Sequence, residues 1–316
     1  MKISVIGCGR WGSFIAWYLD SIGHEVTLYG RRGSGHMAAF EQTRTNGLVT
    51  LPQSLKLGYD TAEACGAEVI VVSVGAQSFR SVAADIAKAG FKGDIALCMK
   101  GIETGTGKRL TEIAGEYLPD NDIGVWIGPG HVQEFTAGIP NCMVIDGTSD
   151  RIREKLVKEF SSPLIRFYYG YDLIGNEVGA AAKNVIGIAA GVLDGLGLTN
   201  LKGALMARGT REVARLIAAM GGNEQSAYGL CHLGDYQATV FSQYSHNRAY
   251  GEALVRGTPF EELAEGCYTV EALMLLKEKY GVDMPISAAV HNTIYGGASA
   301  REEVNGLFMR SLKKEF

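Results

Sequence analysis

The feature that most constrains the fold is a glycine pattern that follows the first apolar segment of the chain. Residues 2–6 have an apolar strand pattern, and a G-x-G-x-x-G motif over residues 7–12 comes directly after it. An apolar helical pattern over 12–22 and a second strand pattern over 24–29 follow. This order predicts a strand–turn–helix–strand unit that binds a dinucleotide, with the pyrophosphate at the helix N-terminus.

Each glycine of the motif has a distinct expected role. Gly7 permits the tight turn, Gly9 lets the backbone approach the pyrophosphate, and Gly12 lets the helix pack closely on the strand. Arg10 and Trp11 stand between the last two glycines, so both are expected at the cofactor. The alternative is a glycine-rich turn without a ligand, which the flanking strands and helix make the weaker interpretation.

Two arginines follow the second strand, at the position that decides which dinucleotide is preferred. An NAD site usually carries an acidic residue there for the ribose hydroxyls, but this chain has Arg31 and Arg32. A guanidinium group matches the oxygens of a 2′-phosphate, whereas a carboxylate would repel them. The sequence therefore favours NADP(H) over NAD(H). The alternative is that the two arginines form a solvated surface pair.

Length and composition indicate a cytoplasmic two-domain protein. The chain has 316 residues, 47% hydrophobic content and a formal net charge of -4, which gives no basic surface for nucleic acid. Its six cysteines have no C-x-x-C or paired spacing, so we expect reduced thiols and no metal site. The longest apolar stretch, 185–198, contains Asp194, which argues against a membrane span.

The pattern of strands and helices changes along the chain and predicts two domains. Buried parallel strands are expected at 2–6, 24–29, 69–74, 94–99, 123–127, 141–145 and 165–169. Helical periodicities follow at 177–196, 201–220, 260–277 and 284–295. We expect an α/β, Rossmann-type doubly wound parallel sheet over 1–170, which binds the dinucleotide, and an all-helical substrate domain over 171–316.

Lys183 and Asn184 stand in an otherwise apolar, small-residue helical run over 177–185. A buried ammonium costs several kcal/mol unless it is paired or its pKa is lowered, so packing alone rarely retains a lysine there. In the alternative interpretation, the Lys183 side chain extends along its methylene groups to the surface. The dinucleotide motif favours the functional interpretation.

Several further segments complete a resemblance that covers nearly the whole chain. They are residues 7–12, 100–103, 128–134, 177–184, 208–209, 234–235 and 264–266. In their order and spacing the chain resembles the NAD(P)-dependent glycerol-3-phosphate dehydrogenase family of soluble bacterial type. The resemblance implies that Lys183 is the catalytic acid/base, that Asp235 supports it, and that Lys100 belongs to the same set near both ligands.

The resemblance also implies residues that bind the two ligands. The cofactor contacts it implies, beyond the N-terminal segments, are Lys100, Val132, Arg248 and Glu265. The substrate contacts are Lys100, Gly128, Gly130, Lys183, Asn184, Asp235, Thr239, Ser245, His246 and Asn247. Taken without the resemblance, Lys100 would be interpreted as a solvated loop lysine and Asp235 as a helix N-cap after Gly234.

One departure from the family pattern falls where the substrate phosphate is expected. The family carries Ser-Arg-Asn-Arg, but this chain has Ser245, His246, Asn247 and Arg248. A histidine is mostly neutral at pH 7 and has fewer donors than the permanently charged arginine fork. Phosphate affinity is therefore expected to fall unless Arg248 shifts in or the bound dianion protonates His246.

Three functions follow from these observations. The favoured one is a cytoplasmic, homodimeric, NADP-linked dehydrogenase that interconverts sn-glycerol 3-phosphate and dihydroxyacetone phosphate. The second is a dehydrogenase of the same fold acting on a different hydroxy acid or a phosphonate. The third is a cofactor-binding sensor without turnover, against which the intact Lys183, Asp235 and Lys100 set argues.

Overall fold

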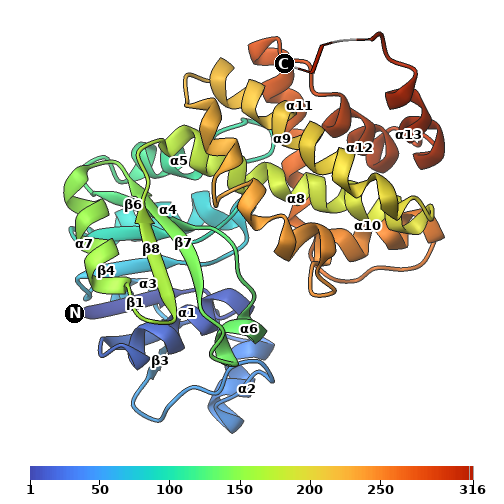
Figure 1. The fold of residues 1–316 in the computed structure, drawn as a ribbon. Coiled ribbons are helices and arrows are strands. Elements are labelled where there is room, and N and C mark those ends of the chain that lie inside the picture. The colour runs from blue at the N-terminus through green and yellow to red at the C-terminus, as the bar shows by residue number, and fades with distance from the viewer. Residues whose placement is uncertain (313, 316) are drawn as a thin grey trace. The chain divides into compact units, whose positions relative to one another are not determined.

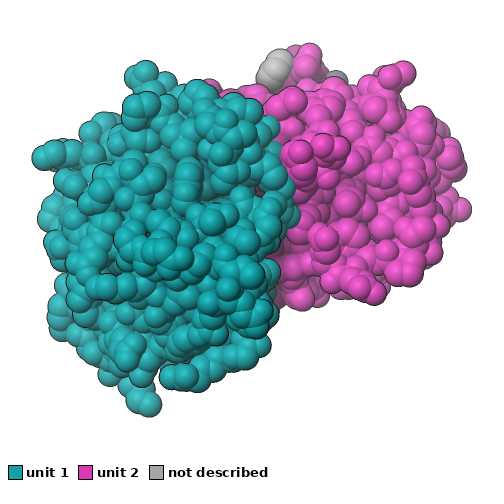
Figure 2. All heavy atoms as spheres, turned by 90° about the horizontal axis from the view of Figure 1, so that it is seen from below, with its two compact units in different colours: residues 1–100, 108–177 teal, residues 101–107, 178–316 magenta. Residues whose placement is uncertain are grey.

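The computed structural model describes residues 1–312, 314 and 315. The chain divides into two compact units, residues 1–100 with 108–177 and residues 101–107 with 178–316 (Figure 2). The boundary predicted near residue 170 falls slightly before this division, and the transfer of 101–107 to the second unit was not predicted. Glu177 explains the later boundary, because its carboxylate accepts hydrogen bonds from Thr111 N at 3.0 Å and from Arg109 Nη1 at 2.7 Å, both in the first unit.

The first unit is built on an eight-stranded sheet of order β3-β2-β1-β4-β5-β6-β7-β8 (Figure 1). Its strands are β1 Lys2–Ile6, β2 Glu25–Tyr29, β3 Lys56–Gly58, β4 Val69–Val72, β5 Asp94–Leu97, β6 Ile123–Ile127, β7 Asn141–Gly147 and β8 Ile165–Tyr169. The predicted Rossmann-type sheet is confirmed, and the three-residue edge strand β3 is an addition to it.

The prediction that all strands run parallel is wrong for one pair. β6 and β7 are antiparallel, with Val125 opposite Asp146 and Ile127 opposite Val144, while the other neighbouring strands are parallel. The apolar runs of two buried strands look the same in either direction, so the sequence pattern does not record the direction of pairing.

Alternate residues of the strands face two separate cores. In β4, Val69 and Val71 belong to one core, and Ile70 and Val72 belong to the other. This alternation follows from the two-residue period of a strand, and buried side chains on both faces require helices on both faces. The first core takes side chains from α1 Arg10–Ser21, α2 Gly35–Thr43, α6 Val132–Thr136 and α7 Asp150–Phe160, and the second from α3 Thr61–Ala64, α4 Phe79–Lys88 and α5 Leu110–Tyr117.

The second unit is built on helices, as predicted. They are α8 Leu173–Gly195, α9 Lys202–Ala219, α10 His246–Arg256, α11 Glu265–Tyr280, α12 Pro285–Tyr295 and α13 Ala300–Phe308. The helix predicted over 260–277 begins only at Glu265, and α10 and α13 were not predicted. In the described chain α8 alone is long and apolar enough to cross a membrane, but 89% of its most apolar window is buried, so it is a core helix.

Glycines allow α8 and α10 to touch at the backbone. A Cβ on Gly191 of α8 would collide with the Arg248 carbonyl of α10, and a Cβ on Gly251 of α10 would collide with the Ile188 carbonyl of α8. Such close approach needs residues without side chains at the crossing point. The contact places Asn247, at the start of α10, beside Asn184 of α8, where Asn247 Nδ2 donates to Asn184 Oδ1 at 3.1 Å.

Candidate functional site

The predicted dinucleotide turn forms between β1 and α1. Gly7 has a φ of 115°, a conformation that favours glycine, and Gly9 is the N-cap of α1. A Cβ on Gly12 would collide with the Gly7 carbonyl oxygen, so the helix and the turn meet at van der Waals contact. Arg10 and Trp11 open α1 directly after the cap. This backbone fits a pyrophosphate, because the backbone amides of a helix N-terminus bind anions.

Arg31 and Arg32 are exposed directly after β2. The guanidinium of Arg32 lies 5.1 Å from the ring centre of Tyr59, whose hydroxyl bonds to Glu41. A guanidinium stacked on an aromatic ring keeps its edge available for an anion. Exposure is consistent both with a 2′-phosphate site and with the alternative of a solvated surface pair.

Lys100 is drawn to the end of a neighbouring strand. Its Nζ donates to the Gly128 carbonyl oxygen at 2.7 Å, which links the segment after β5 to the segment after β6. Gly128 and Gly130 have φ values of 130° and 144°, and Val132 is the buried first residue of α6. The structure therefore gathers four of the sequence-predicted residues at the carboxyl end of two adjacent parallel strands, where α/β folds bind ligands.

The second unit holds the predicted lysine beside its predicted partner. Lys183 Nζ, on α8, lies 3.0 Å from Asp235 Oδ2, and the side chains are 11% and 1% exposed. The same nitrogen donates to Thr239 Oγ1 at 2.8 Å. Thr239 in turn donates its hydroxyl proton to the Asp235 carbonyl oxygen at 2.8 Å, so an oxygen lone pair faces the ammonium. The ammonium is buried with a carboxylate and an oriented hydroxyl, which is the condition for keeping its charge.

His232 and Tyr236 lie beside this arrangement, and neither residue was predicted from the sequence. His232 Nδ1 lies 2.8 Å from the Gly179 carbonyl oxygen, and His232 Nε2 lies 2.7 Å from the Tyr236 hydroxyl. Both residues are fully buried. Burial lowers the pKa of His232 from 6.5 to about 4, so the ring is neutral at pH 7. The available signal was a histidine three residues before Asp235.

Asn247 joins three segments of the site. Besides its bond to Asn184, its Oδ1 accepts from Gly266 N at 2.9 Å. Glu265, the predicted cofactor contact, is the first residue of α11 and directly precedes that amide. Ser245 is the N-cap of α10, and its hydroxyl oxygen accepts from Arg248 N.

His246, which departs from the family pattern, and Arg248, which follows it, both lie in α10. Each of them has an acidic partner. His246 Nε2 lies 2.7 Å from Glu262 Oε2. Arg248 Nη1 lies 2.7 Å from Asp194 and 3.3 Å from Glu252. A shift of Arg248 toward a substrate phosphate would break both ion pairs, which disfavours that way of compensating for the missing arginine.

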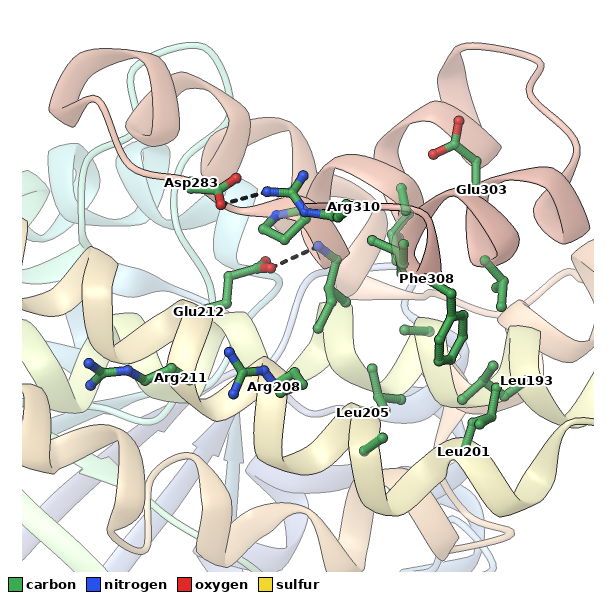
Figure 3. Close-up of a pocket in the computed structure, with 18 of the residues that line it drawn as sticks. Leu193, Leu201, Leu205, Arg208, Arg211, Glu212, Asp283, Glu303, Phe308 and Arg310 are labelled. Atoms are coloured by element: carbon green, nitrogen blue, oxygen red, sulfur yellow. Dashed lines mark hydrogen bonds and ion pairs between the residues drawn. The ribbon is translucent and has the colours of Figure 1, made fainter. Parts of the chain in front are cut away.

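The second unit also contains a cavity of about 600 Å³ (Figure 3). Its lining comes from α8, α9, α12, α13 and the C-terminal segment and does not include Lys183 or Asp235. Figure 3 shows apolar side chains such as Leu205 and Phe308 at one end of this cavity. At the other end, Arg310 pairs with Asp283 at 2.7 Å, and Glu212 accepts from backbone amides of α12. These three charged groups therefore have partners within the protein.

Comparison with known proteins decides the family. The family model described as the NAD-dependent glycerol-3-phosphate dehydrogenase N-terminus matches residues 2–152, and the model of the C-terminus matches residues 172–305. The chain belongs to this family. Its members are NAD(P)-dependent oxidoreductases, and the resemblance stated from the sequence is confirmed.

Relatives in the family match from end to end. A glycerol-3-phosphate dehydrogenase (NAD(P)+) of Chlorobium phaeobacteroides (strain BS1) is 35% identical over 331 residues, which covers 100% of this chain and 99% of the relative. The enzyme of that name from Desulfitobacterium hafniense (strain Y51) is 37% identical over 99% of this chain and 93% of its own. The crystal structure of glycerol-3-phosphate dehydrogenase from Coxiella burnetii has a TM-score of 0.92 at 27% identity and covers 98% of this chain and 99% of its own.

Proposed function

We propose that this chain reduces dihydroxyacetone phosphate to sn-glycerol 3-phosphate with NADPH. One observation carries the proposal: Lys183 is buried against Asp235 and Thr239 in a chain whose full-length relatives are named glycerol-3-phosphate dehydrogenases. A cytoplasmic homodimer is the assembly expected with it, and sedimentation of the purified protein tests the dimer.

The proposed chemistry needs a cation that also donates a proton. A bound nicotinamide cofactor, which the turn at Gly7, Gly9 and Gly12 would hold, would supply a hydride to the carbonyl carbon, with the electron pair of the carbonyl π bond passing to the carbonyl oxygen. Lys183 gives a proton to that oxygen and recovers one from solvent, so the ketone gains one hydride and one proton. A fixed ammonium stabilises the charge that develops on oxygen in the transition state. Asp235 holds the lysine in its charged form, because an opposite charge favours the ammonium.

Two groups of residues are assigned to the ligands. The turn at Gly7, Gly9 and Gly12, with Arg10 and Trp11, is assigned to the pyrophosphate end of the cofactor. Arg31 and Arg32 are assigned to the 2′-phosphate, which makes NADP(H) the preferred dinucleotide. The remaining assignments are Val132, Glu265 and Arg248 for the cofactor, Lys100 for both ligands, and Gly128, Gly130, Asn184, Thr239, Ser245, His246 and Asn247 for the substrate.

A second candidate function rests on the contact between His246 and Glu262. A carboxylate beside the position of the missing arginine opposes a phosphate dianion, so this contact is also consistent with a hydroxy compound that carries less negative charge. This alternative keeps the hydride chemistry and the same lysine. The two candidate functions differ only in the substrate group that binds near His246.

The test is a spectrophotometric assay of the purified protein with NADPH or NADH against phosphorylated ketones, phosphonate analogues and unphosphorylated keto acids. We expect dihydroxyacetone phosphate with NADPH to give the highest kcat/KM. A higher value for an unphosphorylated or phosphonate substrate would replace the first function with the second.

The lysine assignment is tested in the same assay. Lys183→Ala is expected to lower kcat by at least about 10²–10⁴-fold, because it removes a positioned general acid, while the Kd for NADPH stays within about two-fold. Lys92→Ala, which removes an exposed lysine of the first unit, is the control and should behave as wild type. Turnover by Lys183→Ala within a few-fold of wild type would contradict the assignment.

A further inference from the structure

We propose that His232 and Tyr236 are positioning residues that hold Asp235 and Lys183 at their working distance. The inference rests on the proposed function, since it concerns how that lysine is aligned. It goes beyond it by assigning a role to two buried residues whose side chains contact Gly179 and each other.

The hydrogen bonds of His232 fix which ring nitrogen carries the proton. The Gly179 carbonyl oxygen is only an acceptor, so Nδ1, 2.8 Å away, is the nitrogen that donates. The neutral ring then presents Nε2 as an acceptor, and the Tyr236 hydroxyl donates to it at 2.7 Å. The donor and the acceptor are therefore fixed in both hydrogen bonds. The tautomer, and with it the ring orientation, is set by the contact with α8.

The contact with Gly179 reaches the turn of α8 that carries the lysine. Gly179 lies four residues before Lys183, and in an α-helix the carbonyl of residue i−4 accepts the amide of residue i. His232 therefore bonds to the carbonyl oxygen that faces the backbone amide of Lys183 in the helix. A Cβ on Gly179 would press on His232 Cβ at 3.1 Å, so the small residue is what allows the imidazole to come this close.

The backbone of His232 also bonds to the residue that carries the carboxylate, Asp235. Asp235 N donates to the His232 carbonyl oxygen at 3.0 Å within η4 (Leu233–Asp235), and Tyr236 is the next residue. The short segment 232–236 thus bonds through His232 to the turn of α8 that carries Lys183. The same segment places Asp235 beside the lysine nitrogen. A displacement of this segment changes the distance between Asp235 Oδ2 and Lys183 Nζ directly.

A residue of helix α9, Thr210, also contacts Tyr236. The Tyr236 hydroxyl lies 3.5 Å from Thr210 Oγ1, and Thr210 donates its own proton to the Met206 carbonyl at 2.8 Å. The Thr210 contact is at the limit of hydrogen-bond distance, whereas His232 Nε2 lies 2.7 Å from the Tyr236 hydroxyl, so His232 is the acceptor for Tyr236. A buried polar network in which each proton has a partner is rigid and geometrically specific, whereas apolar side chains of similar volume would fill the space without fixing a direction.

The experiment uses three variants of the full chain. Tyr236→Phe removes the hydroxyl alone, His232→Leu removes both hydrogen bonds, and His232→Asn retains a donor for the Gly179 carbonyl. Each is assayed for kcat and KM with dihydroxyacetone phosphate and NADPH, for the Kd of NADPH, and for the primary isotope effect on kcat with NADPH deuterated at the transferred position.

Misalignment of the acid makes the chemical step slower. We expect kcat to fall about 10- to 100-fold in His232→Leu, since small displacements of reacting groups have effects of this size. The fall should be smaller in Tyr236→Phe, with partial recovery in His232→Asn. The isotope effect should rise in each variant because hydride transfer becomes more rate-limiting, and the Kd for NADPH should stay within about two-fold.

A merely structural role gives a different result. The matched control is Tyr18→Phe in the first unit, where a buried tyrosine hydroxyl bonds to Ser162 Oγ at 2.9 Å, and it should lose stability without a change in kcat or isotope effect. If the His232 and Tyr236 variants behave like this control, the positioning role is overturned while the proposed function stands. If Lys183→Ala retains full activity, both are overturned.

Discussion

At the scale of single residues, burial determines how strongly the charge of Lys183 interacts with its surroundings. An exposed lysine beside a carboxylate contributes little, because water and salt screen the pair. Lys183 is 11% exposed and its partner Asp235 1%, so removing either one leaves the other as a buried charge without compensation. The same burial that makes the pair sensitive to mutation would also strengthen the electrostatic field of Lys183 on the carbonyl group of the proposed substrate.

We expect Arg31 and Arg32 to decide the cofactor preference. Replacing both arginines by alanine is expected to raise the KM for NADPH at least about 10-fold, because charge-assisted contacts to the 2′-phosphate are lost, and to change the KM for NADH little. Steady-state kinetics with both cofactors measures this. Equal effects on the two cofactors, or a wild-type preference for NADH, would favour the surface-pair interpretation.

We expect His246 to decide how the substrate phosphate is held. His246→Arg is expected to raise kcat/KM for dihydroxyacetone phosphate about 10- to 100-fold, since a charge-assisted bond contributes roughly 1.5–3 kcal/mol. Glu262→Gln, which removes the opposing carboxylate and leaves the histidine, should give a smaller increase. If His246→Arg leaves dihydroxyacetone phosphate a poor substrate and damages turnover of another compound, the second candidate function is favoured.

At the scale of elements, the first turn of α12 depends on a side chain from α9. Glu212 is fully buried and its carboxylate accepts from Ile286 N at 2.7 Å, Ser287 N at 2.9 Å and Ser287 Oγ at 2.6 Å. Burial raises the pKa of this carboxyl, and the three hydrogen bonds oppose the rise. The carboxylate thus replaces a local N-cap and fastens α12 to α9.

Glu212→Ala is expected to lower the free energy of unfolding of the second unit by roughly 2–4 kcal/mol, because buried donors lose their acceptor at about 1–3 kcal/mol each. Urea denaturation followed by circular dichroism measures the change. Glu278→Ala on α11 is the control, since its side chain is 77% exposed and its loss should stay within about 0.5 kcal/mol. Similar losses in both variants would contradict the capping role.

At the scale of the whole molecule, His232 makes stability depend on pH. Its pKa is lowered from 6.5 to about 4 in the folded protein, so between these values the unfolded chain binds more protons than the folded one. The contribution is therefore fully present above pH 6.5 and is lost as pH falls toward 4. The lost free energy is roughly 3 kcal/mol for a shift of this size.

We expect the free energy of unfolding of the second unit to fall less between pH 7 and pH 5 in His232→Asn than in wild type. Other groups titrate in both proteins, so the difference between the two isolates the histidine. Urea denaturation at the two pH values measures it. An identical decrease in both proteins would show that the ring is not buried in its neutral form.

The sequence by itself determined the elements whose patterns are local. The glycine motif, the first two strands and the change from strands to helices all follow from periodicity and backbone sterics, which neighbouring residues carry. The resemblance, also present in the sequence, named the family and the lysine. The short strand β3 and helix α10 were missed because three residues, or a polar helix such as that after His246, give little periodic signal.

Tertiary structure alone decided what depends on residues far apart in the chain. The antiparallel pairing of β6 with β7 is invisible to a pattern that reads the same in both directions. The contact of His246 with Glu262, the pairing of Arg248 with Asp194, and the bond from His232 to Gly179 each join segments that only folding brings together. Hydrogen-bond direction and desolvation are properties of that packed environment, and for this reason the sequence placed the lysine but not the residues that orient it.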